Sequence, residues 1–238
     1  MLVRDLGTLL RLLRGIPTLG THAERLEAFY GPQASSYDQF REHLLKGRSE
    51  LIAALDISPG ARIVELGAGT GHNVEYYREK IPTLAEVTLV DLCPALLAET
   101  RRRTAHWPNV RAVEADATVL KLEGPVDRVY FSYALTMIPD WEAALINALD
   151  MLCPGGLLGV SDFYVSGASP TDGLVQHGAM ARRFWPWWFR HDGVRLSPDH
   201  LAMLRSYLIP CFLKEDLARV PYLGGLKVPY YVFVGRKK

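Results

Sequence analysis

Short apolar runs alternate with longer amphipathic stretches along most of this chain. Five runs rich in β-branched and aromatic residues predict strands, at 62–66, 86–91, 110–114, 126–132 and 157–163. Helix-like stretches lie between them, at 72–79, 95–105 and 141–152. Because parallel neighbours need a long crossover connection, usually a helix, this alternation predicts a doubly wound α/β fold with a mostly parallel sheet.

The C-terminal region departs from that alternation. Two further strand-like stretches, 212–220 and 228–235, are separated only by a turn that contains proline and glycine. Without a crossover helix, these strands are expected to pair antiparallel. Roughly fifty residues separate the fifth strand from this hairpin, far more than the usual connection. Such an insertion, at about 164–211, is a natural substrate lid.

Two helices are expected before the first strand, at 23–30 and 37–55, with a Gly-Pro break between them. Residues 1–20 combine leucines and arginines in an amphipathic pattern. Such a segment can lie in a membrane interface, cover part of the core or form a loosely held leader, and amphipathicity alone does not separate these alternatives.

Composition narrows the class of protein. The 238 residues, 49% of them hydrophobic, suit one α/β domain. A formal net charge of +1 gives no electrostatic reason to expect nucleic acid as a partner. Three cysteines without CxxC spacing fit a reducing compartment and predict no metal site. No apolar run approaches the roughly 20 residues of a membrane-spanning helix, so we expect a cytoplasmic protein, peripheral on a membrane if residues 1–20 bind one.

A glycine-rich turn follows the first predicted strand and opens the next helix. Its glycines are Gly67, Gly69 and Gly71, and Glu65 precedes them by two positions. Glycines let a backbone turn sharply and approach a ligand closely, and ligands of parallel sheets bind at the carboxyl ends of the strands. Asp91, at the end of the second strand, can accept hydrogen bonds from both hydroxyls of a ribose. It could equally cap the helix that follows it.

Other candidate residues also stand at strand ends. Asp116 and Ala117 follow the third strand, and Ser132 and Tyr133 close the fourth. Asp116 could instead be a simple turn residue. The turn 153–156, Cys-Pro-Gly-Gly, precedes the fifth strand.

In this order, the motifs resemble those of class I, Rossmann-like, S-adenosylmethionine (AdoMet)-dependent methyltransferases (EC 2.1.1). The spacing GxGxG, rather than the GxGxxG of dinucleotide enzymes, favours AdoMet over NAD. The resemblance implies strand order 3-2-1-4-5-7-6, a 1–55 segment of leader and cofactor-covering helices, and a 56–238 methyltransferase domain. The cofactor-binding residues it implies are Tyr37, Arg48, Glu65, Gly67, Ala68, Gly69, Gly71, Asn73, Asp91, Leu92, Asp116, Ala117 and Ser132.

Three stretches, 29–48, 184–201 and 218–231, are similar to the narrower family of diacylglyceryl-homoserine N-methyltransferases of betaine-lipid synthesis. This resemblance implies three methyl transfers to a lipid-borne homoserine amine. Quinone-ring methyltransferases share the Tyr37-Asp38 pair and Arg48, so a quinone or another small hydrophobic acceptor is the alternative. A non-catalytic AdoMet sensor and an NAD-dependent oxidoreductase are alternatives from other classes.

Tyr30, Tyr133 and His177 are catalytic candidates by their place in the chain alone. An amine with a pKa near ~8 is partly neutral at cellular pH, so a dedicated base is not obligatory. A trimethylammonium product cannot donate hydrogen bonds, and aromatic faces are its natural partners. Five aromatic residues at 184–189, flanked by arginines, suggest membrane contact, with residues 1–20 as a second contact. Pro186 within them is expected to interrupt a helix.

Overall fold

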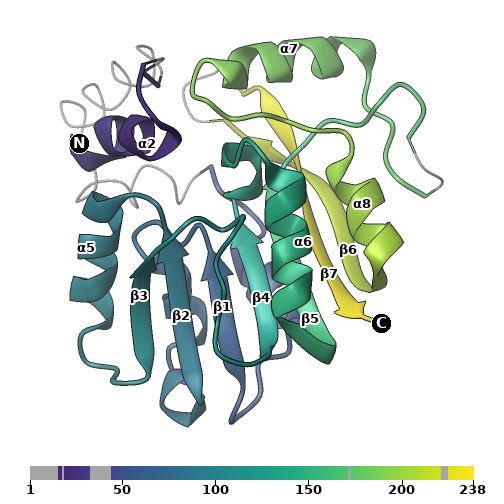
Figure 1. The fold of residues 1–238 in the computed structure, drawn as a ribbon. Helices are drawn as coiled ribbons and strands as arrows, with labels where there is room; N and C mark the ends of the chain where they lie inside the picture. Colours follow the sequence, from purple (N-terminus) through teal and green to yellow (C-terminus); the bar gives the residue numbers. More distant parts are fainter. Residues whose placement is uncertain (1–15, 18, 33–43, 171–172, 221–224) are drawn as a thin grey trace.

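The computed structural model describes residues 16–17, 19–32, 44–170, 173–220 and 225–238. A seven-stranded sheet forms its centre, in the order β3-β2-β1-β4-β5-β7-β6 (Figure 1). The strands are β1 (Arg62–Leu66), β2 (Glu86–Asp91), β3 (Val110–Glu114), β4 (Val126–Ser132), β5 (Leu152–Phe163), β6 (Leu208–Arg219) and β7 (Lys227–Lys237). Strands β1 to β5 pair parallel, and β7 pairs antiparallel with both β5 and β6. The predicted fold class and strand order are confirmed.

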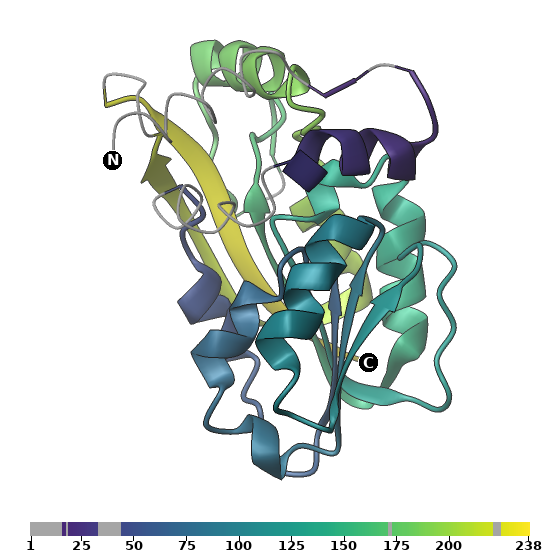
Figure 2. The same ribbon diagram turned by 90° about the vertical axis from the view of Figure 1, so that its left-hand side faces the viewer.

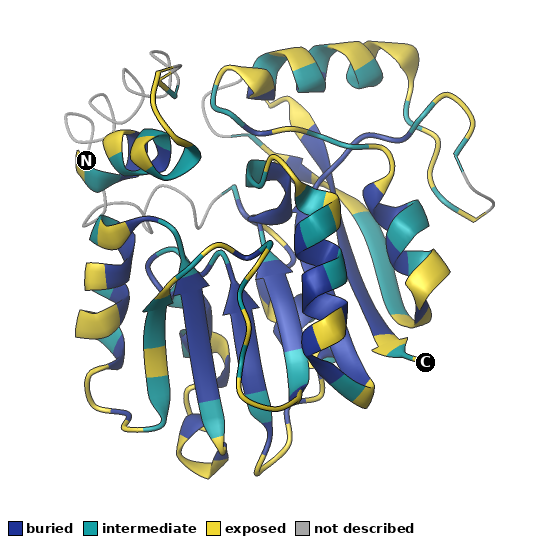
Figure 3. Cartoon of the chain, viewed as in Figure 1, coloured by how far each residue is buried: buried dark blue, intermediate teal, exposed yellow. Residues whose placement is uncertain are grey.

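Alternate residues of the central strands point to opposite faces of the sheet, as the strand period requires. Ile63 packs into one apolar cluster with helix α4 (Arg48–Ala54) and the 3₁₀ segment η2 (His72–Tyr77). Val64 packs into a second cluster with α6 (Trp141–Met151) and α8 (His200–Tyr207). Figure 3 shows the central strands buried and the outer faces of the helices exposed. The polar carboxyl ends of the strands thus remain as the place for a ligand.

Helix α2 (His22–Tyr30) lies over the upper end of α5 (Pro94–Thr104), as Figures 1 and 2 both show. Leu26, Phe29 and Tyr30 pack there against residues at the start of α5. The Glu27 carboxylate accepts hydrogen bonds from the Ala95 N–H and from the Cys93 thiol, both at 3.1 Å. A negative charge at a helix N-terminus satisfies otherwise unpaired N–H groups, so Glu27 fixes α2 on α5.

The expected continuous helix at 37–55 is wrong at residues 44–47, whereas its last part is helical. Residues 33–43 lie outside the described residues, and α4 begins only at Arg48. Gly47 before it has a φ of 82°, and a Cβ there would lie 2.5 Å from the Val232 side chain. Gly47 has a left-handed conformation where the chain passes close to β7, so a helix cannot continue from Leu44 through this glycine.

The expected break at Pro186 is also wrong. Helix α7 runs unbroken from Ala179 to Arg190, with Pro186 inside it. Trp185 and Phe189, on either side of the proline, are buried, and Phe189 stacks on Phe163 with ring centroids 4.9 Å apart. This packing holds the helix in place although Pro186 cannot donate its backbone hydrogen bond.

The described part of the chain contains no helix that combines the length and apolarity needed to cross a bilayer. The described residues also form two short 3₁₀ segments, η3 (Ile81–Thr83) and η4 (Leu135–Met137).

Candidate active site

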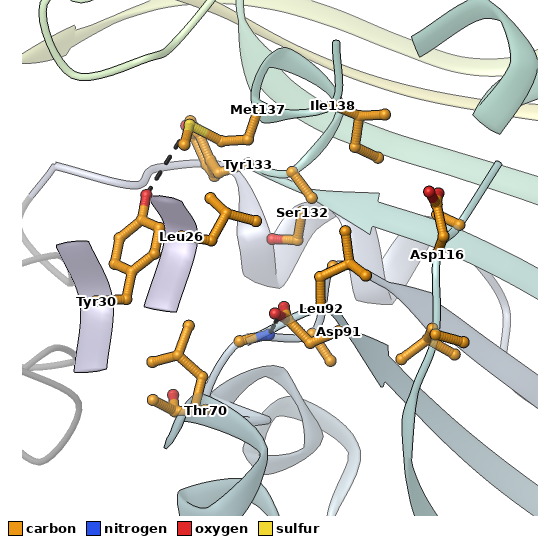
Figure 4. Close-up of a pocket in the computed structure, with 18 of the residues that line it drawn as sticks. Leu26, Tyr30, Thr70, Asp91, Leu92, Asp116, Ser132, Tyr133, Met137 and Ile138 are labelled. Atoms are coloured by element: carbon orange, nitrogen blue, oxygen red, sulfur yellow. Dashed lines mark hydrogen bonds between the residues drawn. The ribbon is translucent and has the colours of Figure 1, made fainter. Parts of the chain in front are cut away.

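A cavity of about 280 Å³ opens at the carboxyl ends of β1, β2, β3 and β4, with α2 as its outer wall. Figure 4 shows its lining: Tyr30 and Met137 at one end, Asp91, Leu92 and Ser132 in the middle, and Asp116 at the other end. Twelve of the sixteen residues predicted for the site line this cavity. They are Tyr30, Arg48, Gly67, Ala68, Gly69, Asn73, Asp91, Leu92, Asp116, Ala117, Ser132 and Tyr133.

The glycine turn forms the floor of the cavity. Gly67, Gly69 and Gly71 all have φ in the left-handed region, at 78°, 57° and 68°. A Cβ at Gly67 would lie 2.3 Å from the Ala134 side chain, and one at Gly71 would lie 2.9 Å from Thr100. The first glycine therefore allows β1 to approach the end of β4, and the third allows the loop to pack on α5. Gly71 packs on α5, on the side of the turn away from the cavity, and does not itself line the cavity.

Asp91 joins two loops of the site. Its carboxylate accepts hydrogen bonds from the Gly69 N–H at 2.7 Å and from the Cys93 N–H at 2.9 Å. Burial raises the pKa of Asp91, while these two backbone donors act against the rise. A carboxylate has about four acceptor positions, so acceptor capacity remains for a ligand in the cavity besides the backbone donors, which include Leu92. The capping role weighed from the sequence and a ligand-binding role are thus compatible.

Glu65 lies beneath the cavity and does not line it. Its carboxylate is fully buried and accepts hydrogen bonds from the Asn73 side-chain amide at 2.6 Å and from the Tyr130 hydroxyl at 2.8 Å. Burial raises the pKa of Glu65 to about 7, against the effect of these donors and of the Arg48 charge. Glu65 therefore orients Asn73, whose Oδ1 is buried without a hydrogen-bond partner in the described structure.

Arg48 brings a buried positive charge to the cavity. The residue is 7% exposed, its Nε donates to the Leu45 carbonyl at 3.3 Å, and its guanidinium lies 5.8 Å from the centre of the Tyr76 ring. Among the described residues, no carboxylate forms an ion pair with Arg48. A buried guanidinium left unpaired is costly, so this position is suited to an anionic group of a ligand.

The opposite end of the cavity suits a flat, polar-edged group. Asp116 is exposed at the rim, where its Oδ1 accepts hydrogen bonds from the Thr118 N–H and hydroxyl, both at 2.8 Å. Its second oxygen has no partner in the described structure. Leu92, Ala117 and Ile138 supply apolar surface beside it.

The end formed by Tyr30 is apolar and aromatic. The Tyr30 hydroxyl lies 3.9 Å from the Met137 sulfur, and Leu26 and Tyr133 complete this end (Figure 4). The Tyr133 hydroxyl donates to the Lys46 carbonyl at 2.6 Å, and burial, followed by the Asp162 charge, raises the pKa of Tyr133 far above its usual value. Tyr133 therefore stays a neutral phenol, and it can offer a ring face but not a phenolate base.

The structure does not bring His177 to this cavity. Its Nδ1 accepts from the Ser166 N–H at 2.9 Å, and its ring packs edge-on against Tyr164. These contacts hold the start of the insertion after β5. Tyr37, also predicted to contact the cofactor, lies outside the described residues.

Sequence reasoning missed two parts of the site. The first is His22 and Leu26, which line the cavity from α2 together with the predicted Tyr30. Their spacing of four residues places them on one helical face, a signal present in the sequence. The second part is η4, which carries Met137. The buried Asp162 accepts hydrogen bonds from the Thr136 N–H and hydroxyl at 3.0 and 2.8 Å, and nothing local in the sequence indicates that contact.

Comparison with known proteins identifies this arrangement. Residues 63–156 match the family model described as "Methyltransferase domain". The matched segment, which covers less than half of the chain, is similar to that domain. This match supports the class that the sequence predicts, the AdoMet-dependent methyltransferases, over residues 63–156. The described residues contain no group of three or more His, Cys, Asp or Glu side chains that could hold a metal ion.

The names of the relatives refer to different methyl acceptors. Trans-aconitate 2-methyltransferase from Methylobacterium nodulans is 32% identical over 127 residues, which cover 53% of this chain and 48% of that protein. The chain thus spans about half the length of this relative. The 2-phytyl-1,4-naphtoquinone methyltransferase of Thermosynechococcus vestitus is 24% identical and covers 84% of this chain and 95% of its own length.

A solved structure shows the same fold. The N-methyltransferase NodS from Bradyrhizobium japonicum, in complex with S-adenosyl-L-homocysteine, has a TM-score of 0.62 and 15% identity, with 90% of this chain and 96% of that one covered.

Proposed function

We propose that this protein transfers methyl groups from AdoMet to a small acceptor, and that the acceptor is the amine of a diacylglyceryl-homoserine lipid. The observation that carries the proposal is the charge pattern of the cavity. Two groups line one cavity at the sheet edge: the buried guanidinium of Arg48, which forms no ion pair with any described residue, and the carboxylate of Asp91, which keeps acceptor capacity. AdoMet has a carboxylate and a ribose that these two groups complement.

The proposed contacts follow from the geometry. Asp91 accepts hydrogen bonds from the ribose hydroxyls, and Arg48 binds the methionine carboxylate, with Asn73 Oδ1 as an acceptor for its ammonium. The backbone at Gly67 to Gly69 approaches the cofactor, and Asp116 accepts from the adenine amino group. Tyr37 stays a prediction as a further cofactor contact.

The transfer is an in-line displacement for which the bound sulfonium supplies the reactive methyl group. What the chain contributes is position: reacting atoms held about 3–3.5 Å apart account for much of the acceleration in such reactions. Tyr30, Tyr133 and Met137 form the end of the cavity where an acceptor amine would meet the methyl group. Since an α-amino group is partly neutral at pH 7, these residues need only orient it and exclude water.

We propose that the insertion 164–211 is the lid through which the lipid acceptor is delivered. Of the aromatic cluster at 184–189, Trp185 and Phe189 belong to the core, whereas Trp187 is 69% exposed beside the exposed Arg183 and Arg190. Met180 on the same helix is 84% exposed. Amphipathic rings next to cations suit a headgroup boundary, which supports peripheral membrane contact through α7.

Liposome flotation tests that contact. Trp187→Ala should recover less protein with anionic vesicles than the wild type does, while Tyr207→Ala, at another exposed aromatic on α8, should not. Equal recovery of all three proteins would remove α7 from membrane contact.

A quinone or similar ring is the second candidate acceptor. Two observations favour it. The 2-phytyl-1,4-naphtoquinone methyltransferase matches most of the chain, and the cavity has an apolar lining by Leu26, Met137 and Ile138. Product mass spectrometry after incubation with AdoMet separates the candidates. Addition of one to three methyl masses to diacylglyceryl-homoserine supports the lipid acceptor, and addition only to a demethylated quinone overturns it. AdoMet binding without any product would identify a sensor.

A further inference from the structure

A second cavity, of about 740 Å³, lies beside the first. It is enclosed by α2, by the C-terminal part of α7 with the loop after it, and by residues that follow η4. His22, Met137 and Pro139 line both cavities. The second cavity therefore adjoins the first along the wall that His22, Met137 and Pro139 form, and Met137 also belongs to the aromatic end of the first.

The second cavity is positively charged. Arg25 projects from α2, Arg190 from the last turn of α7 and Arg195 from the following loop. Within the described ranges, no aspartate or glutamate lines this cavity or forms an ion pair with these arginines. The Nε of Arg25 is buried and has no hydrogen-bond partner in the same part of the structure.

The field of these arginines reaches the junction of the two cavities. Burial lowers the pKa of His22, and the charges of Arg25 and Arg195 lower it further, against the opposite effect of Asp116. Arg25 is half-buried and Arg190 and Arg195 are exposed, and within the described residues no carboxylate balances their charges in the cavity, so an anion bound there would be stabilised. Arginine forks are also the side chains that best match the planar oxygens of carboxylates and phosphates.

Backbone contacts keep the three arginines in place. The Arg195 N–H donates to the Thr136 carbonyl at 2.8 Å, which ties the loop after α7 to η4. The Gly193 N–H donates to the Arg190 carbonyl at 3.2 Å and turns the chain at the end of α7. Arg25 belongs to α2, which Glu27 fixes on α5. The cluster is thus supported by three separate elements.

We infer that the cavity of Arg25, Arg190 and Arg195 binds an oxyanion group, carboxylate or phosphate, of the methyl acceptor. This inference rests on the proposed function, because it takes the adjoining cavity as the site of methyl transfer. The arginines hold the anionic group while the acceptor atom enters between His22 and Met137 toward Tyr30. They are positioning residues and take no part in the displacement. The three apolar residues Pro186, Trp187 and Leu196 line the same cavity and suit the hydrocarbon next to such a group.

Binding to mixed micelles of a neutral detergent tests this, with S-adenosylhomocysteine present. The probes are diacylglyceryl-homoserine, its carboxyl methyl ester and phosphatidylethanolamine. The wild type should bind the free acid or the phosphate lipid roughly tenfold or more tighter than the ester, as hydrogen bonds to charged groups require. Arg25→Gln/Arg190→Gln should lose that preference, and Arg25→Lys should keep part of it. Comparison of the first and third probes identifies the anion.

Arg101→Gln/Arg236→Gln is the matched control, since it removes two exposed arginines that line neither cavity. It should keep the preference, and all variants should bind S-adenosylhomocysteine as the wild type does. Three results would overturn the inference. The wild type could bind the acid, the ester and the phosphate lipid equally, it could bind none of them, or the control variant could lose the preference as much as Arg25→Gln/Arg190→Gln does. Methyl transfer is measured separately: selective binding without product would contradict the proposed function alone, and product formed equally well from the ester would contradict the anion site alone.

Discussion

The hydroxyl of Tyr133 donates a 2.6 Å hydrogen bond to the carbonyl oxygen of Lys46. This contact connects the end of β4, at the aromatic end of the cavity, with the segment that leads into Arg48, the first residue of α4. Tyr133 has a φ of 55°, which is uncommon for a residue with a Cβ and is maintained only where the surroundings fix it. The Tyr133 N–H donates to the Ser161 carbonyl at 2.7 Å and supplies part of that constraint.

Tyr133→Phe should lower the free energy of unfolding by about 1 kcal/mol, the usual net value of one hydrogen bond. The loss stays moderate because the Ser161 hydroxyl also donates to the Lys46 carbonyl, at 3.4 Å. Chemical denaturation measures the change, and Tyr207→Phe, at an exposed tyrosine, is the control. Affinity for AdoMet should fall as well, because the segment before Arg48 is less firmly held. An unchanged unfolding free energy would show that the contact contributes nothing.

Asp91→Asn should weaken AdoMet binding by roughly ten- to a hundredfold, as expected for loss of charge-assisted hydrogen bonds. The amide replaces one acceptor oxygen of the carboxylate by a donor, which faces either the Gly69 or the Cys93 N–H. Isothermal titration with AdoMet gives the affinity. Asp150→Asn changes an exposed carboxylate at the end of α6 and should bind AdoMet normally. Normal affinity in Asp91→Asn would leave Asp91 with the capping role only.

Stability should depend on pH through Glu65. Burial raises the pKa of Glu65 to about 7 in the folded protein, above its ordinary value of 4.5. A carboxyl whose pKa is higher in the folded state binds more protons there, so stability falls as pH rises from about 4.5 to about 7. Asp162, whose pKa burial also raises to about 7, contributes in the same direction.

Glu65→Gln should therefore flatten, without abolishing, the fall in unfolding free energy between pH 5 and pH 8, because Asp162 still titrates. Guanidinium unfolding at several pH values measures it. Glu79→Gln, which alters an exposed carboxylate, should follow the wild-type curve. A steeper curve in Glu65→Gln would contradict the direction of the pKa shift.

Tyr30 should matter most for the later methylations. Tyr30→Phe keeps the ring and removes the hydroxyl, which contacts the Met137 sulfur at 3.9 Å, and should cost little. Tyr30→Ala removes the ring face that a di- or trimethylated ammonium would contact, so the second and third transfers should slow more than the first. Mass spectrometry resolves the three products over time. Equal slowing of all three steps would exclude Tyr30 from this role.

The sheet and the cofactor end of the cavity could be predicted from the sequence because both depend on local patterns. The runs 62–66, 86–91, 110–114 and 126–132 coincide with β1 to β4. Asp91 and Ser132, the last residues of β2 and β4, are polar and line the cavity. Strand period and the rule that ligands bind at carboxyl ends are sufficient for that result.

The remaining features depend on contacts between distant segments. Gly47 is not helical and α4 begins only after it, because β7 lies against it. Pro186 stays within α7 because Trp185 and Phe189 are buried in the core. His177 could be placed near the site by chain order, yet the hydrogen bonds with Ser166 hold it elsewhere. Arg25 and Arg195 face one cavity only through the docking of α2, which no local pattern specifies.

Helix α2 borders both cavities, because His22 lines each of them. Movement of this one helix away from α5 would expose the spent cofactor and the acceptor together. Neither could then be exchanged while the other stays enclosed. We expect repeated methylation to be distributive for that reason, with singly and doubly methylated intermediates released to the medium before they are bound again.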